Sequence, residues 1–179
     1  EVPVPAEWKD CKDEVLGEKA VSGTPEVLDF VNNIQKPINA CQGDKLPVST
    51  FKNVIDGTFP QGTAAYEKRG IAVDVPCWNS EGCLQCNQCA YVCPHAVIRP
   101  VVMNEEEKAA APEGMKITPM TGMPGYYFTM TVSVLDCTGC GSCSNVCPGN
   151  NRNDVLKMAS LESQMDEQKF FDYELTVSD

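Results

Sequence analysis

Hydrophobic and polar residues alternate most regularly between residues 126 and 134. The apolar positions of this stretch are Tyr126, Phe128, Met130, Val132 and Val134, with Tyr127, Thr129, Thr131 and Ser133 between them. Successive side chains of a β-strand point to opposite faces of the sheet, so a period of two separates these residues into two faces. The alternation predicts a strand over 126–134, the clearest element in the sequence.

Three shorter stretches also indicate strands. Residues 71–75 alternate in the same way, and we expect Pro76 to end that strand. Residues 96–102 and 155–158 are short, largely apolar runs of a length that is typical of buried strands. The chain is therefore expected to contain four short strands.

Near the N-terminus the spacing of apolar residues is helical instead. Thr24 followed by Pro25 is a helix-start signal, because threonine caps free N–H groups and proline lacks an N–H that the first turn would leave unpaired. Apolar residues then recur at helical spacing, at Val27, Phe30, Val31 and Ile34. Pro37 is expected to end this helix. One amphipathic helix of about three turns cannot bury its own apolar face, so we expect it to pack on a neighbouring domain.

The remaining segments are rich in turn-forming residues. Residues 41–50 and 56–62 are predicted to be connectors. Residues 104–125 are polar and contain several prolines and glycines, which indicates a loop inserted between two strands. Its three methionines, Met115, Met120 and Met123, are expected to fill packing gaps rather than to bind a soft metal.

Two groups of four cysteines follow two of the predicted strands. The first group is Cys83, Cys86, Cys89 and Cys93, and the second is Cys137, Cys140, Cys143 and Cys147. Each group ends in Cys-Pro, and corresponding cysteines lie 54 positions apart (83 and 137, 93 and 147). Both halves therefore show the order strand, cysteine loop, Cys-Pro, strand. This internal repeat predicts a duplicated unit with pseudo-two-fold symmetry.

The spacing inside each group indicates iron–sulfur chemistry. Both groups match the run C-x2-C-x2-C-x3-C-P, which binds [4Fe–4S] clusters in bacterial two-cluster ferredoxins. Three cysteines at steps of three wrap around one face of a cluster, while the fourth points away and reaches the other cluster. We therefore expect the first cluster to be held by Cys83, Cys86, Cys89 and Cys147. The second cluster is expected to be held by Cys137, Cys140, Cys143 and Cys93.

A pair of structural zinc sites is the alternative for these cysteines. Zinc sites usually combine two C-x2-C pairs that are separated by a dozen or more residues, whereas here four cysteines fall within residues 83–93. Two copies of this denser pattern favour iron–sulfur clusters. The odd total of eleven cysteines also argues against a complete disulfide framework.

The other candidate groups carry less weight. Cys11, Cys41 and Cys77 are scattered, and Cys77 is expected to be a buried or partly buried thiol. His95 is the sole histidine and is expected to have a surface or hydrogen-bonding role. With one histidine, no Ser-His-Asp set and no phosphate-binding loop, we predict no catalytic residues in this chain.

Composition narrows the class of protein. Of the 179 residues, 42% are hydrophobic and 22% are charged, values typical of soluble globular proteins. The net charge of −11 disfavours binding to nucleic acid, and the apolar runs are far shorter than the roughly 20 residues that cross a membrane. We expect a soluble protein of the cytoplasm, with an organelle as the alternative location.

One stretch points to a family. Residues 62–73 include the triplet Glu67-Lys68-Arg69 and are followed by the first cysteine group and by Cys-Pro-His-Ala-Val-Ile-Arg-Pro at 93–100. Together they closely resemble the pyruvate:ferredoxin (flavodoxin) oxidoreductases, and the resemblance extends over residues 38–157. Two parts depart from the family: the loop at 104–125, and the unusual exit at 149–152 after the second group.

The resemblance implies a fold class and an organisation. The fold is expected to be α+β, a bacterial-type dicluster ferredoxin-like domain over 71–160 with the pseudo-two-fold repeat and the inserted loop at 104–125. A mostly irregular and helical linker over 1–70 would precede it, with the Glu-Lys-Arg segment at its end. Residues 161–179 would form a tail that leads to the next domain of a larger enzyme.

The resemblance also implies cofactors and partners. Such enzymes use thiamine diphosphate, Mg²⁺ and three [4Fe–4S] clusters to convert pyruvate to acetyl-CoA, and this chain would hold two of those clusters. It would work with the other domains of a homo-oligomeric parent and pass electrons to ferredoxin or flavodoxin. The alternative is a free-standing dicluster ferredoxin-type carrier with an N-terminal extension, although the 82 residues before Cys83 are more than a small carrier needs.

Overall fold

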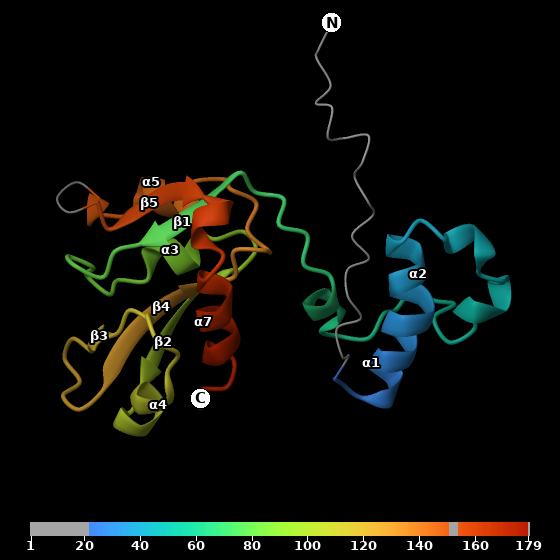
Figure 1. Cartoon of the computed structure of the whole chain (residues 1–179), viewed down its shortest axis with the longest axis horizontal. Coiled ribbons are helices and arrows are strands. Elements are labelled where there is room, and N and C mark those ends of the chain that lie inside the picture. Colours follow the sequence, from blue (N-terminus) through green and yellow to red (C-terminus); the bar gives the residue numbers. More distant parts are fainter. Residues whose placement is uncertain (1–21, 151–153, 179) are drawn as a thin grey trace, which may run out of the picture. The chain divides into compact units, whose positions relative to one another are not determined.

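The computed structural model describes residues 22–150 and 154–178. The chain divides between Glu67 and Lys68 into two compact units (Figure 1), and each is described by itself. None of the helices within the described ranges is long and apolar enough to cross a membrane.

The first unit contains one nearly continuous helical segment. It comprises α1 (Pro25–Phe30), the π-helical turn η2 (Val31–Gln35) and α2 (Lys36–Asn39). Thr24 caps the segment as predicted, because its Oγ1 accepts a hydrogen bond from Val27 N at 3.4 Å. The prediction that Pro37 ends the helix is wrong. The wider π turn ends at Gln35, two residues before this proline, and Pro37 falls in the first turn of α2, where a missing N–H is tolerated.

The helical segment has a small core of its own. Phe30, Val31 and Ile34 are buried against Phe51, Val54 and Tyr66. These partners come from the chain that follows the helix, which contains the short helices η3 (Gly43–Lys45), η4 (Val48–Phe51) and η5 (Thr63–Tyr66); Phe51 lies in η4 and Tyr66 in η5. The expectation that the apolar face of the helix packs on a neighbouring domain is therefore wrong, because the chain after the helix covers it.

The second unit is built on two small antiparallel sheets. In one sheet β1 (Asp74–Trp78) pairs with β5 (Leu156–Ser160). The other has the strand order β2-β4-β3, formed by β2 (Ile98–Met103), β4 (Tyr127–Val132) and β3 (Thr118–Pro119). Both long pairings join a strand from the first half of the repeat to one from the second, as Figure 1 shows. Helices and small sheets together confirm the predicted α+β class.

Pro76 does not end the first strand, contrary to prediction. It lies inside β1, where its Cα pairs with that of Met158. Because β1 belongs to a two-stranded sheet, one of its edges has no neighbouring strand and a proline without an N–H is tolerated there. The strand begins at Asp74 rather than at residue 71, and it continues through Pro76 to Trp78.

The inserted segment is more ordered than its polar composition indicates. It begins with α4 (Glu105–Ala110), which is started by a capping box in which Asn104 and Glu107 bond to each other's backbone N–H at 2.9 Å. Further on, β3 adds to the edge of β4 through the pairing of Thr118 with Phe128. The insertion therefore extends the second sheet instead of forming only a loop.

The acidic C-terminal region packs on the strand that carries the clearest pattern. It comprises η6 (Leu161–Gln164) and α7 (Glu167–Glu174), and α7 contacts β4 (Figure 1). This contact accounts for the burial of the polar face of β4, since Thr131 donates a hydrogen bond to the carboxylate of Glu174. Both faces of β4 are consequently buried, with apolar residues on one side and threonines on the other.

The main core lies between the two sheets and the cysteine loops. Its largest buried side chains include Trp78, Phe128, Met130, Val132 and Leu156. Six cysteines of the two groups belong to this core or pack against it, namely Cys83, Cys89, Cys93, Cys137, Cys143 and Cys147. The fold therefore brings both cysteine groups to one hydrophobic centre.

Candidate metal centres

The eight grouped cysteines line two separate cavities. The first cavity has about 400 Å³ of open space, including solvent at its mouth, and its cysteines are Cys83, Cys86, Cys89 and Cys147. The second has about 330 Å³ on the same measure, and its cysteines are Cys93, Cys137, Cys140 and Cys143. Each cavity thus combines three cysteines of one group with the fourth cysteine of the other group.

The two loops share an unusual backbone. The residues on either side of the second cysteine have a left-handed conformation in both loops, Gln85 and Asn87 in the first and Gly139 and Gly141 in the second. Such residues curl the chain so that neighbouring N–H groups and side chains turn toward one concave side, an arrangement found at anion and iron–sulfur sites. The loop geometry therefore follows the same 54-residue spacing as the cysteines.

In each group a short helix contains the third cysteine, and the fourth cysteine follows at or just after its end. Helix α3 (Gln88–Tyr91) carries Cys89, and Cys93 follows its end. Helix α5 (Ser142–Val146) carries Cys143, and Cys147 is its C-terminal cap. Because α3 and α5 pack against each other, the end of each helix lies near the loop of the other group.

The cavity walls are largely apolar. Trp78, Phe128, Met130 and Leu156 line the first cavity, and Pro76, Val97, Ile98 and Met158 line the second. The indole Nε1 of Trp78 is buried and has no hydrogen-bond partner among the described residues. A bound cluster offers sulfide acceptors, so an unpaired donor in a residue of this wall fits such a group.

Burial controls the protonation of the thiols. It raises the pKa of Cys89 and of Cys143 to about 11 and also raises the pKa of Cys137. Exposed Cys140 differs, because hydrogen bonding with the backbone and the hydroxyl of Ser142 lowers its pKa. Metal-free thiols at these three positions are therefore neutral at pH 7, and binding a metal there must release their protons.

The cysteines of each cavity surround a volume rather than a point. Within the described ranges, no three Cys, His, Asp or Glu side chains are grouped closely enough to hold one metal ion. Zinc requires sulfurs at about 2.3 Å from a single ion. A [4Fe–4S] cube instead takes each of its four thiolates at a different iron. Four thiols around an apolar cavity therefore fit the cluster.

Two contacts at the site could not be read from the sequence. The Sγ of Cys89 lies 3.3 Å from the Sδ of Met130. Met130 belongs to β4, the strand that the alternation of apolar and polar residues predicts. The side chain of Gln85 is bound by the inserted segment, donating to Pro119 O at 2.9 Å and accepting from Thr121 N at 2.8 Å. The sequence gives one hint of the second contact. Gln85 stands at the position that corresponds to Gly139 in the other loop, and both residues have a left-handed backbone.

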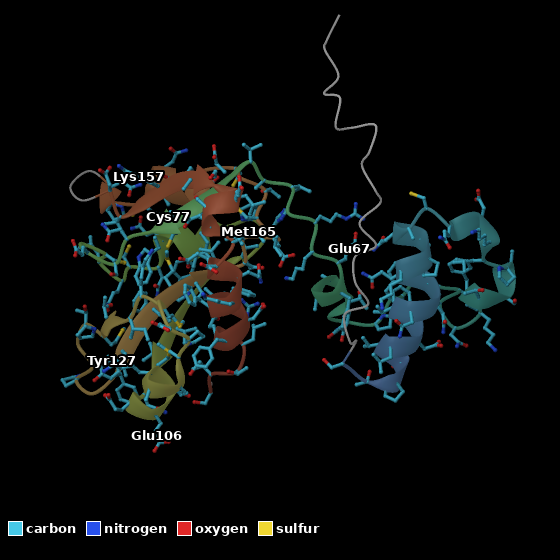
Figure 2. All side chains as sticks on the ribbon, viewed as in Figure 1. Glu67, Cys77, Glu106, Tyr127, Lys157 and Met165 are labelled. Atoms are coloured by element: carbon cyan, nitrogen blue, oxygen red, sulfur yellow. The ribbon has the colours of Figure 1, made fainter. Side chains whose placement is uncertain are left out.

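The remaining candidates lie apart from the cavities or at their edges. Cys77, labelled in Figure 2, is a partly buried free thiol on β1, as predicted. It belongs to the lining of neither cavity. Cys41 is exposed in the first unit, and Cys11 lies outside the described residues. His95 is exposed and contributes to the wall of the second cavity.

The packing prediction for the methionines of the insertion holds in part. Met120 packs against the main core, and Met115 is half-buried. Met123 is 45% exposed, so the prediction is wrong for that residue. It lies in a turn at the tip of the insertion, where Tyr126 N donates to Met123 O at 3.2 Å and the side chain has no gap to fill.

Two family models match separate parts of the chain. Residues 82–151 match a 4Fe-4S dicluster domain, and residues 17–72 match a domain of unknown function called EKR. Both the cysteine loops and the Glu-Lys-Arg segment therefore belong to recognised sequence families.

Relatives match over nearly the whole chain. A pyruvate-flavodoxin oxidoreductase of Klebsiella pneumoniae is 47% identical over 178 residues, which is 99% of this chain and 15% of the relative. A pyruvate:ferredoxin oxidoreductase of Moorella thermoacetica is 47% identical over 90% of this chain and 13% of the relative. A pyruvate dehydrogenase [NADP(+)] of Cryptosporidium parvum is 45% identical over 89% of this chain and 8% of the relative. The chain thus spans about a seventh or less of the length of these relatives.

Proposed function

Because this chain corresponds to a segment of the pyruvate:ferredoxin (flavodoxin) oxidoreductases, we propose that it conducts electrons through two [4Fe–4S] clusters in such an enzyme. The overall reaction converts pyruvate and coenzyme A to acetyl-CoA, carbon dioxide, a proton and two electrons. Thiamine diphosphate, Mg²⁺ and a third cluster would be supplied by other parts of the parent. The electrons would leave singly for ferredoxin or flavodoxin.

The sorting of the cysteines into two cavities is the observation that carries this proposal. Cys83, Cys86, Cys89 and Cys147 would hold the first cluster, and Cys137, Cys140, Cys143 and Cys93 the second. When bound, each cluster supplies one site that accepts and gives up a single electron. Each half of the repeat would depend on the other for its fourth ligand, so neither half could hold its cluster alone.

The protein around the clusters would keep them dry and fix their spacing. Buried Trp78, Phe128 and Leu156 would exclude water from the first cluster, and Val97 and Ile98 from the second. Exclusion of water and hydrogen bonds to the sulfurs are the means by which a protein sets cluster potentials. The packing of α3 against α5 would hold the two sites close together for electron exchange.

We also propose that the second unit has pseudo-two-fold symmetry and that the chain has three regions. The exchange of strands between halves, β1 with β5 and β2 with β4, supports the symmetry. The regions would be a linker over 1–70, the ferredoxin-like domain over 71–160 and a C-terminal tail over 161–179. The other domains of a cytoplasmic, homo-oligomeric parent would be their partners.

A free-standing ferredoxin-type carrier is not favoured. The relatives that match nearly all of this chain are enzymes of which it covers 8–15%. The match also begins far before the first cysteine, at residue 17 for the EKR family. Similarity that covers the linker together with the cysteine loops is what an enzyme segment predicts.

The proposal is tested by loading the chain with iron and sulfide under anaerobic conditions. We expect about eight irons per chain, the content of two [4Fe–4S] clusters, and a brown protein that takes up two electrons. After chemical reduction, the chain should pass those electrons to oxidised flavodoxin. A colourless protein that binds zinc in place of iron, or reduced clusters that do not react with flavodoxin or ferredoxin, would contradict the proposal.

A further inference from the structure

The Glu-Lys-Arg segment lies where the two units meet in sequence, and its first two residues are held by different units. Glu67 accepts a hydrogen bond from Gln35 Nε2 at 3.2 Å, within the first unit (Figure 2 labels Glu67). Lys68, the next residue, forms an ion pair with Asp136 within the second unit. Two consecutive residues are therefore each bonded within a different unit.

Lys68 is bound directly before the second cysteine loop. Its Nζ pairs with the carboxylate of Asp136 and donates to Ser133 Oγ at 3.4 Å. Ser133 Oγ also donates to the same carboxylate at 2.6 Å, which closes a triangle of polar groups. The lysine and aspartate side chains are only 21% and 31% exposed, so water screens their charges less than at a free surface. Asp136 immediately precedes Cys137, which lines the second cavity.

The backbone after Lys68 runs along the same loop. Gly70 N donates to Leu135 O at 2.9 Å, and Gly70 has a left-handed φ of +58. A Cβ on Gly139 would lie 2.9 Å from Asp74 O and 3.4 Å from the Cβ of Ala72. Residues 68–74 therefore support residues 133–139 by a polar contact at one end and close backbone packing at the other.

The first cysteine loop has no equivalent of this charge pair in its sequence. The position that corresponds to Asp136, 54 residues earlier, is Gly82, and the position that corresponds to Ser133 is Asn79. Within the described residues, an aspartate paired with a lysine immediately precedes the second loop, whereas a glycine immediately precedes the first. Any effect of this pair on a bound group should be confined to the second cavity.

We propose that Lys68 positions the second cysteine loop and neutralises Asp136 beside it, and that it thereby raises the reduction potential of the cluster held by Cys137, Cys140, Cys143 and Cys93. This inference rests on the proposed function. Reduction adds one electron to the cluster, and a nearby uncompensated carboxylate opposes that added negative charge. The positive charge of Lys68 offsets most of this repulsion. Lys68 therefore has a specific role within the Glu-Lys-Arg segment.

The test is a redox titration of the full, iron-loaded chain, followed by electron paramagnetic resonance. Lys68→Met should lower the potential of one cluster, and Asp136→Asn should raise the potential of the same cluster. We expect each change to alter the ratio of reduced to oxidised cluster at a fixed potential by up to about tenfold, or ~59 mV for one electron. The double variant should return close to the original value, as should Lys68→Arg, and the other cluster should not move.

Lys157→Met is the matched control. This lysine lies on β5, pairs with Asp154 at 2.9 Å and is 62% exposed (Figure 2). Its loss removes the same charge from the chain in a well-solvated place, so both potentials should stay unchanged. An equal shift in this control would show that Lys68 acts only through net charge, which would overturn the inference.

The outcomes separate this inference from the proposed function. Two clusters with normal potentials in every variant would overturn the role of Lys68 and leave the proposed function standing. Shifts of the same sign for Lys68→Met and Asp136→Asn, or loss of iron without any shift, would mean a structural role alone and would also overturn it. Failure of the unmodified chain to bind iron would overturn both. Should Lys68→Met not fold, the upward shift expected for Asp136→Asn still decides the sign, with Lys68→Arg as the reference that keeps the charge.

Discussion

The two cysteine loops have the same ligand spacing and backbone curvature but are supported by different parts of the chain. The first loop, 83–89, is held from outside by a side chain, since Gln85 bonds to Pro119 and Thr121 of the inserted segment. The second loop, 137–143, is held by close backbone packing of Gly139 on residues 72–74 and by the pair of Lys68 with Asp136. The two loops thus share their cysteine spacing and their left-handed backbone positions, whereas the residues that pack against each loop differ.

The difference also changes the environment of the two sites. In the second loop Cys137 and Cys143 are both buried, while their counterparts Cys83 and Cys89 are half-buried. A charged pair stands beside the second loop and a neutral insertion contact beside the first. Two clusters with identical ligands would therefore have different potentials, which is useful in a relay because it gives electron flow a direction.

Removal of iron should have the largest effect and should act on both loops. Burial raises the pKa of Cys89 and Cys143, so without iron these thiols are neutral. Both belong to or pack against the main core, and removal of the cluster would leave that part of the core without the group that links the two loops. Hydrogen exchange after chelation should show loss of protection in the second unit. The helix over 25–39 should stay protected, because its core contains no cysteine. Full protection of both loops without iron would contradict their dependence on metal.

Gly139→Ala should have the next largest effect and should act on the second loop. The new Cβ would lie 2.9 Å from Asp74 O, and the residue has a φ of +70. Clash and left-handed strain together should cost about 1–3 kcal/mol of unfolding free energy and speed loss of the second cluster. Denaturant unfolding of the iron-loaded chain measures the first quantity, and the decay of visible absorbance in air measures the second.

Gly141→Ala is the control for that change. Its φ is +73, but a Cβ there would meet no atom of the described residues within 4 Å. Only the left-handed strain applies, with a cost of roughly 1–2 kcal/mol. Equal destabilisation by the two alanines would mean that the close approach of residues 72–74 does not support the loop.

Gln85→Ala should have the smallest effect and should act on the first loop. It removes hydrogen bonds to Pro119 O and from Thr121 N, each worth about 0.5 kcal/mol, the low end of the usual range, because both are exposed to water. Hydrogen exchange should become faster over 118–121, and the first cluster should be lost sooner than the second. Asn87→Ala has the same left-handed backbone, and the Asn87 side chain makes no capping bond to α3, so it controls for the backbone change. A similar response to both substitutions would contradict the role of Gln85 in tying the first loop to the inserted segment.

The cysteine spacing determined most of what could be predicted. Ligand runs are local in sequence, so the two cysteine loops and the flanking strands could be predicted from neighbouring residues. The grouping by cavity also matches the predicted ligand sets, although the ligation itself stays a prediction. The polar face of β4 was recognised as a face, but its cover by α7 was not, because the acidic C-terminal region has no strong pattern.

The errors arose where tertiary context overrides a local rule. Pro76 is tolerated because β1 lies in a sheet of only two strands, and Pro37 because a π turn precedes it. Neither the number of strands in a sheet nor a π turn can be inferred from nearby residues. The partners of Gln85 and Lys68 lie more than 30 residues away in the sequence, which places them beyond any local pattern.

Exchange of the fourth ligand between the loops is the central claim, and paired serine variants test it most directly. Cys93→Ser should leave about four irons per chain and remove hydrogen-exchange protection from the distant loop at 137–143, while 83–89 stays protected. Cys147→Ser should show the reverse, with loss confined to 83–89. If each variant instead disturbed the loop of its own group, the two cavities would not be the cluster sites described above.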